Sequence, residues 1–147
     1  WEERHPPLPV ESCTKAAGCV PEPAAVTLDA QRRWLHDAAK DQYANCGAPG
    51  GWNSSLCPDA ASCARNCAVD GLRLEDYADK YGVSTDASGV TIAYVSGQPG
   101  NYGSRLFVLD GETEEYTLFK LKNRELSFDI DVSKLACGLN AALYFVE

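Results

Sequence analysis

Seven cysteines in 147 residues constrain this chain more than any other feature of its sequence. Six of them gather in the first half, at Cys13, Cys19, Cys46, Cys57, Cys63 and Cys67. Cys137 stands alone, far along the chain. Clustered cysteines in a chain of this size predict disulfides that staple loops, and disulfides persist in oxidising compartments. We therefore expect a secreted, extracellular protein in which at least one thiol has no partner within the chain.

Zinc is the competing interpretation for Cys57, Cys63 and Cys67. Zinc sites favour paired cysteines with C-x-x-C spacing, or nearby histidines. Here five and three residues separate the cysteines, and the only histidines are His5 and His36. We therefore expect disulfides, no metal site and no cofactor.

Charge and hydropathy exclude two classes of partner. The formal net charge is −8, whereas proteins that bind nucleic acid carry an excess of Lys and Arg. No apolar run approaches the roughly 18 residues of a membrane helix. We expect no nucleic-acid partner and no membrane partner. The sequence Asn53-Ser54-Ser55 is a glycosylation sequon, which agrees with secretion and makes Asn53 a candidate glycosylation site.

The hydrophobic pattern predicts an antiparallel all-β sandwich with short helical turns. Short helices are expected from Cys57 to Cys67, with Pro58 and Asp59 in the first turn, and from Leu74 to Lys80, ended by Gly82. Apolar residues alternate elsewhere, as in strands, and turn signals stand at 110–111 and 122–123. The expected strands are 26–29, 34–36, 89–95, 104–109, 116–121, 126–132 and 141–146. Nothing marks a domain boundary, so residues 1–147 are expected to form one unit or part of one.

The far end of the chain adds a second expectation. An apolar, strand-like segment runs over 141–146 with no turn after it, and the lone Cys137 comes shortly before. We expect a larger secreted domain whose remaining C-terminal part covers the apolar faces. Unpaired strand edges and exposed apolar faces favour association. The isolated 147 residues are therefore expected to aggregate or to fold only in part.

Nine short sequences, in order, resemble the N-terminal part of glycoside hydrolase family 7, the cellobiohydrolases and endoglucanases that cut cellulose. They include Arg33-Trp34-Leu35-His36 and Cys137-Gly138-Leu139-Asn140. The full set covers residues 13–20, 26–29, 33–36, 56–59, 66–71, 81–85, 103–106, 126–132 and 137–140. The resemblance extends from about His5 to Glu147.

This resemblance implies a β-jelly-roll of two curved antiparallel sheets, related to the concanavalin fold, with a cleft or tunnel that holds a glucan chain. It also implies secretion, no metal, and cleavage of β-1,4-glucosidic bonds with retention. The family pattern further implies a set of disulfides: Cys13–Cys19, Cys46–Cys67 and Cys57–Cys63. Cys137 would then pair with a cysteine beyond Glu147.

The family's catalytic motif, E-x-D-x-x-E on one strand, does not occur in this sequence. In the family, one glutamate attacks the anomeric carbon and the other protonates the leaving oxygen, and retention needs the two carboxyls about 5–5.5 Å apart. Asp129 and Asp131 share a strand face, but no glutamate follows at the required spacing. We expect no catalytic residue in this chain and no activity from the chain alone.

The resemblance marks six residues as candidates for binding a β-glucan. Trp34 matches a tryptophan that stacks on a glucose ring, against the alternative of an ordinary core aromatic. Arg33 and Arg105 match cleft arginines, and the fixed donors of a guanidinium suit sugar hydroxyls. The alternative is an exposed surface cation for Arg33 and a surface salt bridge for Arg105. The remaining candidates are Asn101, Asn140 and Tyr144.

Asn140 and Tyr144 are four residues apart, so a regular strand would put both on one face. Their alternatives are a turn asparagine and a core tyrosine. The chain departs from the family at Arg32, where a second aromatic is common. One stacking platform is expected to be lost there.

Two further functions compete with a retaining β-1,4-glucanase. The missing carboxylates leave open a non-catalytic glucan-binding or structural module. A disulfide-rich secreted interaction domain, whose cleft residues have drifted as Arg32 suggests, is the other alternative.

Overall fold

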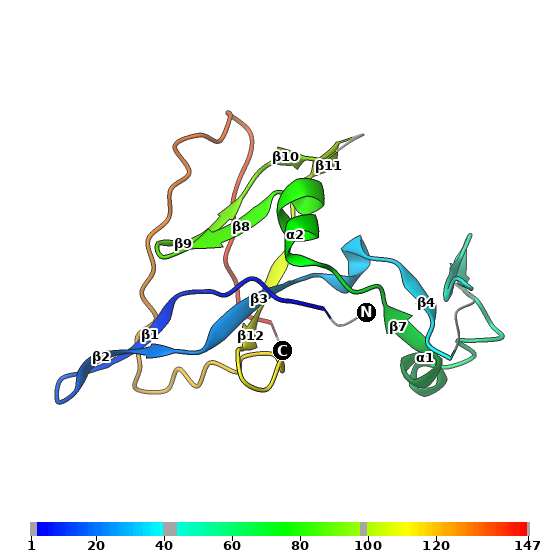
Figure 1. Cartoon of the computed structure of the whole chain (residues 1–147), viewed down its shortest axis with the longest axis horizontal. Coiled ribbons are helices and arrows are strands. Elements are labelled where there is room, and N and C mark those ends of the chain that lie inside the picture. Colours follow the sequence, from blue (N-terminus) through cyan, green and yellow to red (C-terminus); the bar gives the residue numbers. More distant parts are fainter. Residues whose placement is uncertain (1–2, 40–43, 98–99, 147) are drawn as a thin grey trace. The chain divides into compact units, whose positions relative to one another are not determined.

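The computed structural model describes residues 3–39, 44–97 and 100–146. The chain divides into two compact units, Trp1–Thr117 and Leu118–Glu147, called here the first and the second unit. Among these described residues the regular structure is mostly antiparallel β with two α-helices, and all of it lies in the first unit (Figure 1).

Two antiparallel pairs organise the first unit. β1 (Val10–Thr14) and β2 (Gly18–Glu22) form a hairpin in which Cys13 lies opposite Cys19. β3 (Ala24–Leu28) pairs with β12 (Leu106–Asp110), so that Val26 lies opposite Val108 and two segments distant in sequence are joined. The expected strands at 26–29 and 104–109 are confirmed within a residue or two of these bounds.

The core of the first unit forms around β3 and α2 (Leu74–Tyr81). Its buried side chains are Val26, Leu28, Leu72, Tyr77 and Val83. Burying a side chain of this size contributes roughly 1.5–3 kcal/mol. The core is therefore small, and Tyr77, which is 0% exposed, is its largest member.

Local sequence explains where α2 begins and ends. The carboxylate of Asp76 accepts the backbone N–H of Arg73 at 3.2 Å, which satisfies a donor at the helix start. Gly82 ends the helix at φ +65°, a left-handed conformation that glycine adopts without strain. A Cβ at Gly82 would also lie 2.8 Å from the Cβ atoms of Ala93 and Ser96. The predicted helix and its glycine end are confirmed.

The other helix, α1 (Ala60–Asn66), starts later than the predicted start at Cys57. Asp59 is extended, and its side chain accepts the backbone N–H of Ser62 at 2.8 Å. Asp59 is thus the N-cap rather than a first-turn residue, because its carboxylate satisfies an N–H that the helix leaves open. In the part of the chain that the structure describes, no helix has both the length and the apolar character needed to cross a membrane.

The other strands form short hairpins and one short long-range pair. They are β4 (Leu35–Asp37) with β7 (Cys67–Val69), β5 (Gly47–Ala48) with β6 (Gly51–Trp52), β8 (Val83–Asp86) with β9 (Gly89–Ile92), and β10 (Val95–Ser96) with β11 (Asn101–Tyr102). Every sheet among the described residues has two strands. The two broad sheets of a jelly roll are not formed within them.

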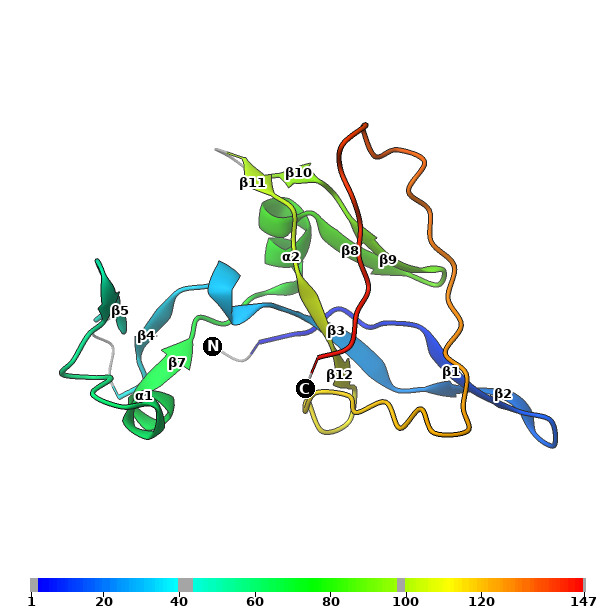
Figure 2. The same cartoon turned by 180° about the vertical axis from the view of Figure 1, so that it is seen from behind.

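The second unit has no strand over its described residues 118–146, as the orange-to-red trace in Figure 2 shows. The strands predicted at 116–121, 126–132 and 141–146 are therefore wrong for this structure. Tyr116 forms only an isolated bridge with Leu109, inside the first unit. Thr117 N–H also bonds to the Val108 carbonyl at 2.9 Å, but no ladder continues beyond it. A strand persists when a neighbour takes up its hydrogen bonds, and the described residues 118–146 form no such ladder. The predicted turn at 122–123 does form, and Arg124 N–H bonds to the Leu121 carbonyl at 3.0 Å.

Candidate functional site

Two segments of the first unit, 29–34 and 101–105, lie side by side and contain four of the six predicted binding residues. Asp29 begins the 3₁₀ turn η1 (Ala30–Arg32) by accepting the N–H of Gln31 at 2.8 Å. The same carboxylate accepts a hydrogen bond from Arg105 Nε. Arg105 also donates from Nη2 to Gln31 Oε1 at 2.9 Å, and its carbonyl accepts Asp29 N–H at 2.9 Å. Arg105 is thus held against η1, with 45% of its side chain exposed.

Arg32 provides a second connection between the two segments. Its Nη1 donates to the Tyr102 carbonyl at 3.2 Å, and its own carbonyl accepts the Tyr81 hydroxyl at 3.2 Å. Ser104 Oγ donates to the Tyr81 carbonyl at 2.8 Å. Arg32 therefore connects η1 to β11 and to the end of α2.

Asn101 lies in β11, half-buried, beside the last turn of α2. Its Nδ2 donates to the Lys80 carbonyl at 3.4 Å, and the same carbonyl accepts Ser96 Oγ at 3.0 Å. Next to it, the rings of Tyr94 and Tyr102 meet edge to face with centroids 6.2 Å apart. These tyrosines are 46% and 61% exposed, and sequence reasoning did not select either of them. Tyr94 directly precedes β10 and Tyr102 lies in β11, so the hairpin brings together two rings that no sequence spacing marks as a pair.

Trp34 follows η1 and is 37% exposed, so it is not a buried core aromatic. Its Nε1 donates to Asn45 Oδ1. Its ring meets His36 with centroids 5.2 Å apart, tilted by 48°. Both contacts limit rotation of the indole while part of it stays open to solvent.

Arg33 is largely shielded from solvent, whereas the sequence left open an exposed surface cation. Its side chain is only 7% exposed, so it is not a surface cation. The guanidinium binds both carboxylate oxygens of Glu3, at 2.8 and 2.5 Å. Its role in binding a glucan stays a prediction.

Asn140 and Tyr144 belong to the second unit. Both are exposed, Tyr144 by 57%. The strand on which their shared face depends does not form, so the spacing argument for this pair fails in this structure. Their binding role stays a prediction.

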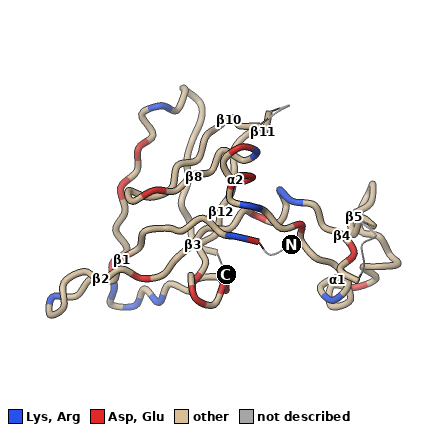
Figure 3. Tube along the Cα trace, in the orientation of Figure 1, with Lys and Arg blue, Asp and Glu red and all other residues tan. Residues whose placement is uncertain are grey.

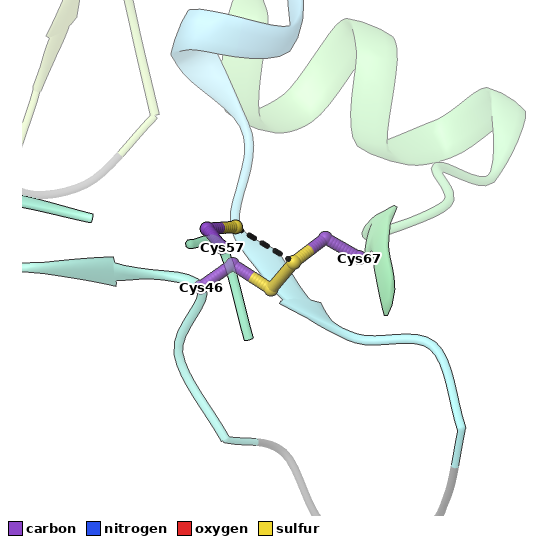
Figure 4. Close-up of side chains that lie close together, drawn as sticks. All are labelled: Cys46, Cys57 and Cys67. Carbon is purple, nitrogen blue, oxygen red and sulfur yellow. Dashed lines mark hydrogen bonds between the residues drawn. A yellow bond between two sulfur atoms is a disulfide. The ribbon is translucent and has the colours of Figure 1, made fainter. Parts of the chain in front are cut away.

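The three disulfides that the family resemblance implied are all present: Cys13–Cys19, Cys46–Cys67 and Cys57–Cys63. Cys137 is exposed and has no disulfide partner among the described residues. Figure 4 shows Cys57 beside the Cys46–Cys67 bond, with its Sγ 3.4 Å from that of Cys67. Cys46, Cys57 and Cys67 are close enough to surround a metal ion, as are Glu11, Cys13 and Cys19. Their sulfurs are disulfide-bonded in both groups, and metal ligation requires thiolates.

The whole chain, residues 1–147, matches the model of glycosyl hydrolase family 7. The chain belongs to this family. Three solved family structures are similar to it. A cellobiohydrolase from Daphnia pulex is 36% identical over 75% of this chain and 25% of its own, with a TM-score of 0.59. A cellobiohydrolase from Melanocarpus albomyces complexed with cellotetraose is 36% identical over 72% of this chain and 24% of its own, with a TM-score of 0.56. An endocellulase from Humicola insolens is 32% identical over 74% of this chain and 27% of its own, with a TM-score of 0.56.

This family 7 chain therefore spans about a quarter of the length of those relatives. Its four clustered candidates all come from the first unit. The residues that sequence reasoning missed are their supports: Glu3, Asp29, Gln31 and Asn45. Asp29 could have been found as an N-cap, because it accepts the N–H of Gln31 two residues later. No local pattern marks the other three.

Asn53 of the sequon contacts Asn45, the residue that accepts the hydrogen bond from Trp34. Its Nδ2, the atom that glycosylation would modify, donates to the Asn45 carbonyl at 3.1 Å, and its Oδ1 accepts Ser55 N–H at 3.1 Å. Glycosylation of Asn53 stays a prediction. A separate hollow of about 370 Å³, lined by His5, Thr27, Leu109, Glu114, Glu115 and Tyr116, includes none of the predicted binding residues.

Charged groups stabilise the helix that supports the site. Figure 3 shows basic residues in blue and acidic residues in red on α2. Asp76 accepts from Arg73 Nε at 3.1 Å and lies 2.9 Å from Lys80 Nζ. The hydrogen bonds from Arg73 and then Lys80 hold the pKa of Asp76 well below its ordinary value. Burial raises the pKa of Tyr77 to about 12, because the phenolate would be poorly solvated in the core.

Proposed function

We propose that this chain is the N-terminal portion of a single catalytic domain that cleaves β-1,4-glucosidic bonds of cellulose or a related β-glucan with retention. Membership of family 7 and the similarity to cellulases support this. One similar structure is a complex with cellotetraose and another, 28% identical, is an endoglucanase complexed with cellobiose. In this proposal the chain supplies cleft residues, and the catalytic carboxylates come from residues outside it.

The remaining part of the domain completes the fold. Leu118, Ile130 and Leu143 are 81%, 73% and 58% exposed in the second unit, and apolar side chains at this density are costly in water. We propose that further strands of a jelly roll pair with this unit and cover these side chains. The same part supplies the partner of Cys137, and the protein is secreted and glycosylated at Asn53.

The observation that carries the binding role is the arrangement around Trp34. A partly exposed indole, restrained by Asn45 and His36, offers a flat apolar surface for the C–H face of a glucose ring. Arg105 and Asn101 lie on the neighbouring segment as donors for sugar hydroxyls. Separate glucan contacts by Asn140 and Tyr144 of the second unit, and by Arg33, are also part of the proposal.

Hydrolysis of cello-oligosaccharides by the full-length protein tests the function. We expect cleavage that preserves the anomeric configuration. Proton NMR spectra of the fresh products measure that configuration. Trp34→Ala is expected to weaken binding about three- to tenfold, the value of one aromatic contact. Glu11→Gln, an exposed acid on β1, is the matched control. Inversion of configuration, or an unchanged affinity in Trp34→Ala, would contradict the proposal.

A non-catalytic glucan-binding module is the second candidate, favoured by the absence of E-x-D-x-x-E from the sequence. Calorimetry with cellohexaose separates the two functions. Binding without any hydrolysis by the full-length protein supports the module. Hydrolysis excludes it.

A further inference from the structure

Glu3 connects the beginning of the chain to the segment that carries Trp34. Its Oε1 and Oε2 accept hydrogen bonds from Nη1 and Nη2 of Arg33, 30 positions further along. A bidentate pair of this kind fixes the plane of the guanidinium as well as its position. The two side chains are 17% and 7% exposed, so water competes little for either group.

The carboxylate of Glu3 is itself anchored to the core. The hydroxyl of Tyr77 donates to Glu3 Oε1 at 2.8 Å, and it accepts the backbone N–H of Leu28 at 3.3 Å. Tyr77 is completely buried. The position of Glu3 is therefore set by the core of the first unit rather than by a mobile surface contact.

Arg33 transmits this position to Trp34 in two ways. It directly precedes Trp34, so its backbone carries the tryptophan. Its Nε also donates to the Asp70 carbonyl at 3.2 Å, and Asp70 N–H donates to the Trp34 carbonyl at 2.8 Å. Loss of the Glu3 carboxylate would leave a shielded guanidinium without its charge partner. Such a group moves toward water because its burial is unfavourable when unpaired.

We propose that Glu3 is a positioning residue that, through Arg33, sets the orientation of Trp34 as a platform for a glucose ring. This inference rests on the binding role of Trp34 proposed above. Arg33 thereby acts chiefly as the connection between Glu3 and Trp34, and a β-glucan gains affinity from an indole that is already oriented.

A double-mutant cycle on the full-length protein tests this role. The variants are Glu3→Gln, Trp34→Ala and the two combined, with Glu11→Gln as the matched control. Affinity for cellohexaose is measured by calorimetry, and kcat and KM are measured on the same substrate. We expect Glu3→Gln to weaken binding about threefold, to raise KM and to leave kcat unchanged. In the Trp34→Ala background, Glu3→Gln should cause no further loss. Glu3→Asp keeps the charge with a shorter reach, so its loss should be smaller, and it serves as the test variant if Glu3→Gln does not fold.

The failures of the two proposals are distinguishable. If Trp34→Ala weakens binding and Glu3→Gln does not, only the positioning role is overturned. An equal loss from Glu3→Gln with and without Trp34 also overturns it, because Glu3 would then act elsewhere. If Trp34→Ala itself leaves the affinity unchanged, the binding role of Trp34 fails, and the positioning role fails with it.

Discussion

β3 and the segment 126–132 have the same kind of sequence and different structures. Residues 26–29, which overlap the end of β3, and residues 126–132 both alternate apolar and polar side chains, and both were predicted to be strands. β3 pairs with β12 over five residue pairs, and Val26 and Leu28 are buried at 2% exposure. In the other segment, Phe128 and Ile130 are 52% and 73% exposed and no strand forms. Alternation thus determines which side chains share a face, whereas a partner strand determines whether the backbone forms a ladder.

Truncating an aromatic residue in each unit should give the largest contrast. Tyr77→Ala removes the largest buried side chain and leaves a cavity, so we expect the free energy of unfolding to fall by about 3–5 kcal/mol. Phe119→Ala removes a ring that meets Phe145 at 5.9 Å in the second unit, and its expected cost in this chain is within about 0.5 kcal/mol. Urea denaturation of both variants measures the two costs.

The same pair of variants in the full-length protein sharpens the comparison. If further strands cover the second unit, Phe119→Ala should there cost about 3 kcal/mol or more, as core aromatics do. An equally small cost in both contexts would mean that the second unit stays uncovered.

Replacing cysteines should give the next largest change in the free energy of unfolding. Cys46–Cys67 joins segments 21 residues apart inside the first unit. Replacing both cysteines with serine is expected to lower the free energy of unfolding by about 3 kcal/mol, because the unfolded chain gains freedom. Cys137→Ser in the second unit should change it by less than about 0.5 kcal/mol in this chain. Denaturation with and without a reducing agent measures both, and a large effect of Cys137→Ser would show that this thiol has a structural partner.

The same contrast shows how far sequence reasoning reaches. The helix at 74–81 was predictable because its signals are local: apolar spacing, a carboxylate near the start and Gly82 at the end. The disulfides needed the family pattern, since spacing alone leaves several pairings open. The pair of Glu3 with Arg33 was not predictable, because neither residue carries a local signal of the other. The strands at 116–121, 126–132 and 141–146 were mispredicted because alternation shows which side chains share a face but not whether a neighbouring strand is present to pair with.

The next largest effect is a loss of stability at alkaline pH, which we expect from Tyr77 in the first unit. Tyr77 has a pKa of about 12 in the folded chain, against about 10 for an unperturbed tyrosine. The folded state therefore keeps a proton that the unfolded state releases, and stability falls as the pH rises from about 10 to 12. The total loss is about 2–3 kcal/mol. Tyr77→Phe should remove this part of the pH dependence, as melting temperatures between pH 8 and 11.5 would show. An unchanged alkaline slope would mean that Tyr77 is more solvated than its burial indicates.

The smallest expected effect is on acid stability, and it compares two carboxylates of α2. The pKa of Asp76 is lowered, chiefly by the hydrogen bond from Arg73 and then by that from Lys80. The folded state therefore holds Asp76 deprotonated, and the resulting stability is present above the ordinary pKa of about 4 and is lost as the pH falls below it. Because Arg73 and Lys80 are 55% and 62% exposed, we expect only about 1 kcal/mol from these pairs. Asp76→Asn should lower stability at pH 7 by that amount and flatten the acid limb of a melting-temperature profile between pH 2 and 7. Asp79→Asn, an exposed acid on the same helix, should leave the profile within about 0.5 kcal/mol of the original. Equal effects of the two substitutions would mean that net charge, rather than the bonds to Asp76, sets the acid stability of the helix.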